Sequence, residues 1–170
     1  MRKIKILAAA FLVCFCPVFA SAYSVAFQIL QRDSSESKIR EATYGIEENL
    51  FDFFFSKGIV ISNSPVTVSE DSSSDENHFR KSFDEALEGG VDYFIEIIGE
   101  FDVSDSSDST STRLENIKCV SWKVKEVDSG KVLGSGKGVP PSALKIKNVQ
   151  KGISDFTVVL ATEIYKAIGR

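Results

Sequence analysis

The run Gly134-Ser135-Gly136-Lys137-Gly138 combines glycines with a lysine, as phosphate-binding loops do. Such a loop needs a glycine five residues before Gly136, but Lys131 stands there, and no Ser or Thr follows Lys137. Pro140-Pro141 also replaces the helix that should come next. We therefore interpret these glycines as part of an edge strand or of a strand packed closely against another element.

Other reactive side chains are too scattered to indicate catalysis or metal binding. His78 is the only histidine, and Cys119 is the only cysteine after residue 16. A zinc cluster or a Cys/His catalytic pair needs more such residues, so we expect a solvated His78 and a structural Cys119. No serine lies in a histidine-bearing motif, and no carboxylate pair has an apolar setting. The sequence thus predicts no active site, no cofactor and no enzyme activity.

Asp102, Asp105 and Asp108 bring carboxylates and hydroxyls together in a Ser/Thr/Asp-rich segment over 102–112. A calcium-binding EF-hand loop places ligands at every second residue and also needs a central glycine and a terminal glutamate. The segment has neither, so we expect a solvated loop and no metal site.

One group of aromatic residues has a spacing that suggests binding. In a helix over 36–56, Tyr44, Phe51 and Phe55 project together, about 140° from the main apolar face. That main face carries Ile39, Thr43, Ile46, Leu50 and Phe53. Either a neighbouring helix of the same domain covers the three aromatics, or they form an exposed patch for a partner protein.

The apolar periodicities predict the elements that position these residues. We expect strands over 24–31, 59–61 with an edge continuation over 66–68, 91–98, 114–127 and 131–139, and helices over 36–56, 78–88 and 149–168. The order β-α-β-α-β-β-β-α indicates one α/β domain over 23–170, a sandwich of three helices on a mixed sheet.

Local signals set the expected boundaries. Ser34 or Ser35 can cap the first helix, and the segment over 69–77, which lacks apolar residues, should be a solvated loop before the second helix. Gly89-Gly90 should end that helix, and Asp128-Ser129-Gly130 should form a hairpin turn.

The strand over 91–98 is dense in β-branched and aromatic residues, which places it at the centre of the sheet. Phe94 and Ile95 should be buried there. In the strand over 114–127, alternation points Trp122 to the core and Lys123 and Lys125 to water.

Residues 1–22 have the features of a secretory signal peptide. Three basic residues precede an uncharged apolar run that is too short to span a bilayer, and Ala20-Ser21-Ala22 fits a cleavage site. Cleavage there would leave Tyr23 as the first residue and change the formal net charge from −4 to −7. Such an acidic chain is a poor partner for nucleic acid. Cys14 and Cys16 would leave with the signal unless one is lipidated, and the residues before them, Val13 and Phe15, do not favour lipidation.

The segment over 83–97 and the later hairpin resemble the small bacterial envelope domain shared by CsgG, LpoB and the TolB N-terminal domain. In that superfamily a helix ends in Gly-Ala-Asp-Tyr before a central strand, and a hairpin turns at Thr-Gly-Glu. Here Gly90-Val91-Asp92-Tyr93 and Asp128-Ser129-Gly130-Lys131 occupy those places. The order of elements matches over most of residues 23–170.

This resemblance implies a non-enzymatic module that binds other envelope proteins, as LpoB-like domains bind a penicillin-binding protein and CsgG-like domains assemble into an outer-membrane channel. We expect a periplasmic or secreted adaptor or assembly factor that binds another envelope protein. It would associate with the membrane only if lipidated at Cys14 or Cys16. The alternative is a periplasmic module that binds a small molecule or a glycan, and an enzyme using carboxylates is a third class.

Overall fold

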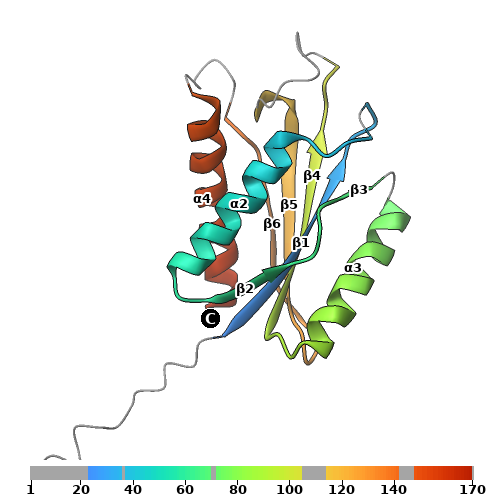
Figure 1. Cartoon of the computed structure of the whole chain (residues 1–170), viewed down its shortest axis with the longest axis vertical. Helices are drawn as coiled ribbons and strands as arrows, with labels where there is room; N and C mark the ends of the chain where they lie inside the picture. The colour runs from blue at the N-terminus through green and yellow to red at the C-terminus, as the bar shows by residue number, and fades with distance from the viewer. Residues whose placement is uncertain (1–22, 36, 70–71, 105–113, 142–147, 170) are drawn as a thin grey trace, which may run out of the picture.

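The computed structural model describes residues 23–35, 37–69, 72–104, 114–141 and 148–169 (Figure 1). Within them the fold is the expected α/β sandwich with three helices and a mixed sheet. The elements are β1 (Ser24–Arg32), α2 (Glu41–Ser56), β2 (Val60–Asn63), β3 (Thr67–Ser69), α3 (Ser72–Glu88), β4 (Tyr93–Phe101), the 3-10 turn η1 (Leu114–Asn116), β5 (Ile117–Glu126), β6 (Val132–Gly138) and α4 (Val149–Ile168).

The sheet has the strand order β2-β1-β4-β5-β6, and β3 continues the edge next to β1. β1 pairs in parallel with β2, β3 and β4, whereas β5 is antiparallel to both β4 and β6. Pro65 lies between β2 and β3, where a residue without a backbone N–H interrupts an edge strand. The prediction of a strand that continues past this proline is confirmed, as is the central place of β4.

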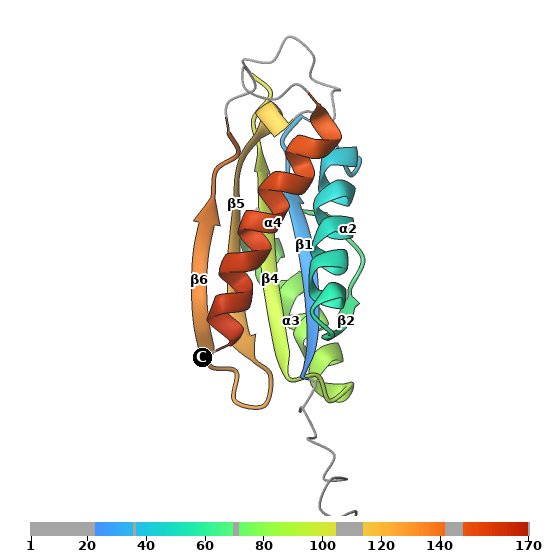
Figure 2. The same cartoon turned by 90° about the vertical axis from the view of Figure 1, so that its left-hand side faces the viewer.

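The helices cover the two faces of the sheet unequally. α2 and α4 lie side by side on one face and α3 lies on the other (Figures 1 and 2). The main core forms between the sheet and the pair α2/α4, and a smaller cluster forms beneath α3. Phe94, Ile95 and Trp122 are buried as predicted.

The glycines of β6 confirm the prediction of a closely packed edge strand. A Cβ atom at Gly136 would lie 2.6 Å from Cζ2 of Trp122, and one at Gly134 would lie 2.8 Å from Cβ of Ala167 in α4. Real Cβ atoms do not approach so closely. β6 can therefore lie over Trp122 and beside α4 only because these positions lack side chains.

The first helix begins five residues later than predicted, at Glu41, and Ser35 does not cap it. The side chain of Gln31, at the end of β1, accepts hydrogen bonds from the Arg40 backbone N–H and the Thr43 hydroxyl and donates one to the Lys38 carbonyl. These contacts hold the preceding segment in a non-helical conformation. Ser35 instead donates its backbone N–H and its hydroxyl to Asp33.

The predicted loop over 69–77 is wrong for most of its length, because α3 begins at Ser72. Asp75 is buried in the first turn, where it accepts hydrogen bonds from Ser69 and Arg32. A carboxylate also favours the positive end of the helix dipole. His78 is consequently half-buried within the helix and does not start it.

The predicted turns are confirmed. Gly90 follows α3 with a φ of 65°, and Gly130 turns the hairpin between β5 and β6 with a φ of 64°. Both angles fall in the region that glycine adopts without steric cost. Residues 1–22, and with them the predicted signal peptide, Cys14 and Cys16, lie outside the described residues. In the part that is described, every helix is too short or too polar to cross a bilayer.

Candidate functional site

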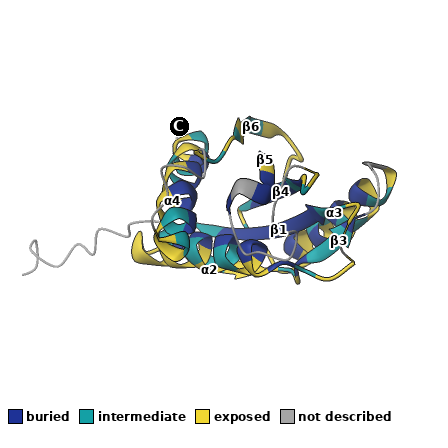
Figure 3. Ribbon diagram, turned by 90° about the horizontal axis from the view of Figure 1, so that it is seen from above, coloured by how far each residue is buried: buried dark blue, intermediate teal, exposed yellow. Residues whose placement is uncertain are grey.

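Tyr44, Phe51 and Phe55 form what we call the aromatic face of α2. Their exposed fractions are 50%, 36% and 69%. The rings of Phe51 and Phe55 are stacked, with centroids 6.5 Å apart. Figure 3 shows exposed residues along the side of α2 that points away from the sheet. The spacing predicted from the sequence therefore does gather these aromatics, and the alternative of an intramolecular cover is wrong for the described residues.

α4 leaves this face open because it contacts α2 on another side. Gly45 approaches α4 so closely that a Cβ atom there would lie 3.1 Å from Cγ2 of Ile153. Phe53 meets Tyr165 of α4 edge to face, with centroids 6.3 Å apart. Phe54, which the sequence did not place in the core, is buried beneath the helix. The aromatic face is therefore exposed to solvent.

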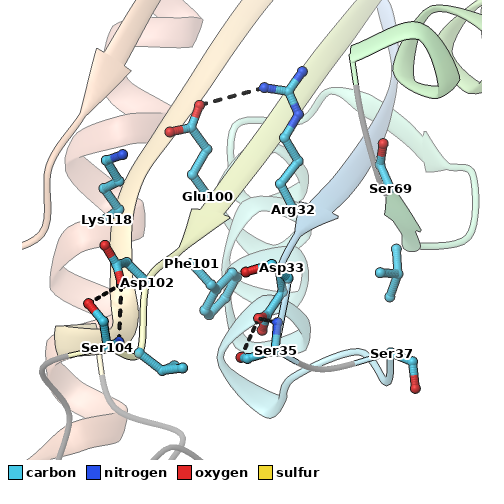
Figure 4. A pocket seen from close by; sticks show the side chains of 13 residues that line it. Arg32, Asp33, Ser35, Ser37, Ser69, Glu100, Phe101, Asp102, Ser104 and Lys118 are labelled. Carbon is cyan, nitrogen blue, oxygen red and sulfur yellow. Dashed lines mark hydrogen bonds and ion pairs between the residues drawn. The ribbon is translucent and has the colours of Figure 1, made fainter.

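A second candidate site lies where β1, β3 and β4 end, and we call it the strand-end hollow (Figure 4). Its volume is about 1130 Å³. The carboxyl ends of parallel strands are common ligand-binding positions in α/β folds. Five serines line the hollow together with Arg32, Asp33, Glu100, Asp102 and Lys118.

Asp33, which lines this hollow, forms a buried ion pair with Arg40, and the two side chains are only 2% and 6% exposed. Burial by itself raises the pKa of Asp33, but hydrogen bonds from Arg40 and Ser35 outweigh that effect and hold the pKa below its ordinary value. The guanidinium of Arg40 also lies 5.4 Å from the centre of the Phe101 ring. Asp33 is thus a fixed anion that organises the end of β1.

Asp102 and Lys118 line the opposite wall. The side chain of Asp102 accepts hydrogen bonds from the backbone N–H and the hydroxyl of Ser104, which lower its pKa. Figure 4 shows Lys118 beside Glu100 and Asp102. Asp105 and Asp108, the other carboxylates considered for calcium, lie outside the described residues.

The hollow offers hydrogen-bonding groups beside apolar surface from Val68, Phe101 and Val103. Its one aromatic side chain, Phe101, is buried, so no ring of the described wall is free to stack on a sugar. Within the described ranges, no three His, Cys, Asp or Glu side chains gather as a metal site requires. No sequence pattern indicates this site directly, because its residues come from strand ends far apart in the chain. The polar run that follows β1 was the only hint.

Cys119 is buried on β5, where its thiol donates a hydrogen bond of 3.3 Å to Glu100. Burial raises the pKa of this thiol. A protonated, enclosed thiol is a poor nucleophile, in agreement with the structural role expected from the sequence.

Several solved structures resemble this chain at low sequence identity. A PelC dodecamer from Paraburkholderia phytofirmans is 13% identical over 85% of this chain and 90% of its own, with a TM-score of 0.53. The LpoB C-terminal domain from Salmonella enterica is 17% identical over 69% and 82%, with a TM-score of 0.41. TolB from Acinetobacter baumannii is 12% identical over 85% and 28%, with a TM-score of 0.34.

The likeness to PelC shows a shared fold. The sequence resemblance pointed to LpoB, TolB and CsgG. LpoB and TolB are among these structures, and the resemblance to CsgG stays a prediction. No curated protein matches the sequence significantly. One family model, described as "Uncharacterised protein", matches residues 24–169, and the chain therefore belongs to that family.

Proposed function

We propose that this protein is a secreted, non-catalytic component of a bacterial envelope that binds another envelope protein through the aromatic face of α2. The observation that carries the proposal is the exposure of three aromatic side chains on one helix, two of them stacked on each other. Each aromatic side chain can bury roughly 150–250 Å² on binding. Aromatic residues also supply much of the binding energy in protein interfaces.

The envelope location rests on the signal-like features of residues 1–22 and on the fold shared with PelC. The resemblance to LpoB-like domains, which bind another envelope protein, supports an adaptor or assembly factor. PelC assembles as a dodecamer. A second copy of this chain is the alternative occupant of the aromatic face, and an increase in molar mass with protein concentration would identify it.

The strand-end hollow favours the alternative, a periplasmic module that binds a small molecule. Its volume of about 1130 Å³ is ample for a polar metabolite. The buried position of Phe101 makes a glycan a weaker candidate, because sugars usually stack on an exposed ring.

The aromatic face is tested by changing Phe51 and Phe55 together to serine. We expect the melting temperature to change little, because substitutions at exposed sites usually alter stability by only about 0.5 kcal/mol. Capture of a partner from envelope extract should be lost. A photo-crosslinking amino acid at position 51 of an otherwise unchanged chain should join that chain to the same partner.

The matched control changes Val158 and Val159 to serine, since both are exposed apolar residues on the neighbouring helix α4. This control should melt and capture like the wild type. Capture that survives the change of Phe51 and Phe55 would contradict the proposal. A large loss of stability in that variant would show that the two rings contribute to the core.

A further inference from the structure

α3 and the strands β4 and β5 enclose a second hollow on the face of the sheet opposite to α2 and α4. Its volume of about 480 Å³ falls within the roughly 300–1,000 Å³ typical of ligand pockets. Along α3 it is lined from Asp75 through Phe79 to Phe83, which are spaced at one turn. These positions span about 12 Å along the helix, so the hollow is a groove, which we call the α3 groove.

Two lysines share a single carboxylate on the sheet side of this groove. Glu96 is only 7% exposed. Its Oε2 atom lies 3.1 Å from Nζ of Lys123, and its Oε1 atom accepts a hydrogen bond from Lys125. The side chains of Lys123 and Lys125 are 46% and 26% exposed, so both ammonium groups can also be reached from solvent.

The residues that line the α3 groove carry one more positive than negative charge, although the molecule is acidic. Four cations and three carboxylates line it: Arg32, Arg80, Lys123, Lys125, Asp75, Glu76 and Glu96. The whole chain, in contrast, has a formal net charge of −4. Among the described residues, the buried Nε of Arg32 has no hydrogen-bond partner. Arg32 is already paired with Asp75 and lies 3.7 Å from Glu100, so the positive charge left in excess is at Lys123 and Lys125, which share Glu96.

Apolar side chains lie directly beside these cations. Phe83 and Ile98 are half-buried and line the groove, and Nζ of Lys125 is 5.6 Å from the centre of the Phe83 ring. We propose that the α3 groove binds a small organic carboxylate, with its head group beside Lys123 and Lys125 and its apolar chain along Phe83 and Ile98. Glu96 occupies the head-group position from within the protein.

The probe for this proposal is octanoate, compared with octanol and octylammonium, each titrated into ¹⁵N-labelled protein and followed by NMR. Octanoate should shift the backbone signals of α3, β4 and β5. The neutral and cationic probes should bind at least about tenfold more weakly, because they cannot form charged hydrogen bonds with the lysines. Equal binding of octanol, or shifts confined to other elements, would overturn the proposal.

Changing Lys123 and Lys125 together to methionine keeps the long side chains and removes both charges. Octanoate affinity should fall at least about tenfold. The matched control changes Lys81, on the outer side of α3, and Lys151, on α4, to methionine; both lysines are largely exposed. It makes the same change in net charge and should bind octanoate like the wild type. Equal affinities for the two double variants would overturn the proposal.

A third variant separates ligand binding from a purely structural role of Glu96, Lys123 and Lys125. Glu96→Gln removes the internal carboxylate that competes for the lysines, so octanoate affinity should rise severalfold even though the melting temperature falls. A structural ion-pair cluster with no ligand would show the lower melting temperature without the gain in affinity. A folded Glu96→Gln protein with unchanged or weaker octanoate binding would therefore contradict the proposal.

Discussion

Asp33 and Arg40 show what one ion pair does for the end of a strand. Their side chains are almost fully enclosed, so neither charge can regain water if its partner is removed. Asp33→Asn should therefore lower the free energy of unfolding by roughly 3 kcal/mol at pH 7, measured by urea denaturation. Asp155→Asn is the control, because the exposed Lys151–Asp155 pair on α4 should contribute less than about 1 kcal/mol.

The same pair predicts a pH dependence. The pKa of Asp33 in the folded protein lies below its ordinary value of 3.8, which is the value expected in the unfolded chain. The pair therefore stabilises fully above that ordinary value, and its contribution is lost as the pH falls through the lower, folded-state pKa. The stability difference between wild type and Asp33→Asn should shrink as the pH falls below about 4. A difference that stays constant down to pH 3 would contradict this assignment.

Individual residues also show how much of the candidate sites could be predicted from the sequence. The helical spacing of Tyr44, Phe51 and Phe55 was visible in the sequence, and in the structure all three are exposed on α2, with Phe51 and Phe55 stacked. Their exposure could not be predicted, because it depends on which side of α2 contacts α4. Glu96, Lys123 and Lys125 come together through the antiparallel register of β4 and β5, which no local pattern specifies.

β6 illustrates an element that forms only because of its composition. Gly136→Ala would place a Cβ atom 2.6 Å from Trp122, so we expect a loss of about 1–3 kcal/mol in stability and a shift in fluorescence of this single tryptophan. Gly99→Ala in β4 is the control, since its nearest neighbour would be Phe101 at an ordinary 3.6 Å. An unchanged Trp122 spectrum in the Gly136 variant would show that the strand can move aside at little cost.

Most elements could be predicted because their apolar periodicity is strong. The starts of α2 and α3 could not, because both depend on side-chain hydrogen bonds with residues at the ends of β1 and β3, which apolar periodicity does not reveal. Gln31 holds the chain before α2, and Arg32 and Ser69 hold Asp75 in the first turn of α3. A polar segment that is typical of a solvated loop can thus form a helix when side chains of neighbouring strands bind its buried carboxylate.

At the scale of the whole molecule, the sheet separates two surfaces of different chemistry. The aromatic face of α2 is apolar and exposed, whereas the α3 groove places two lysines on one buried carboxylate. A protein partner suits the first and a small anion the second. The two proposed activities should therefore be separable, since the two surfaces share no residue.

This separation gives a reciprocal prediction for the two double variants. The Lys123/Lys125 methionine variant should capture the protein partner like the wild type, and the Phe51/Phe55 serine variant should bind octanoate like the wild type. Sites without shared partners usually couple by less than about 0.5 kcal/mol, which is roughly a twofold change in affinity. Pull-down and NMR titration of both variants measure this. A tenfold loss of octanoate affinity in the serine variant would instead place the octanoate site on the aromatic face.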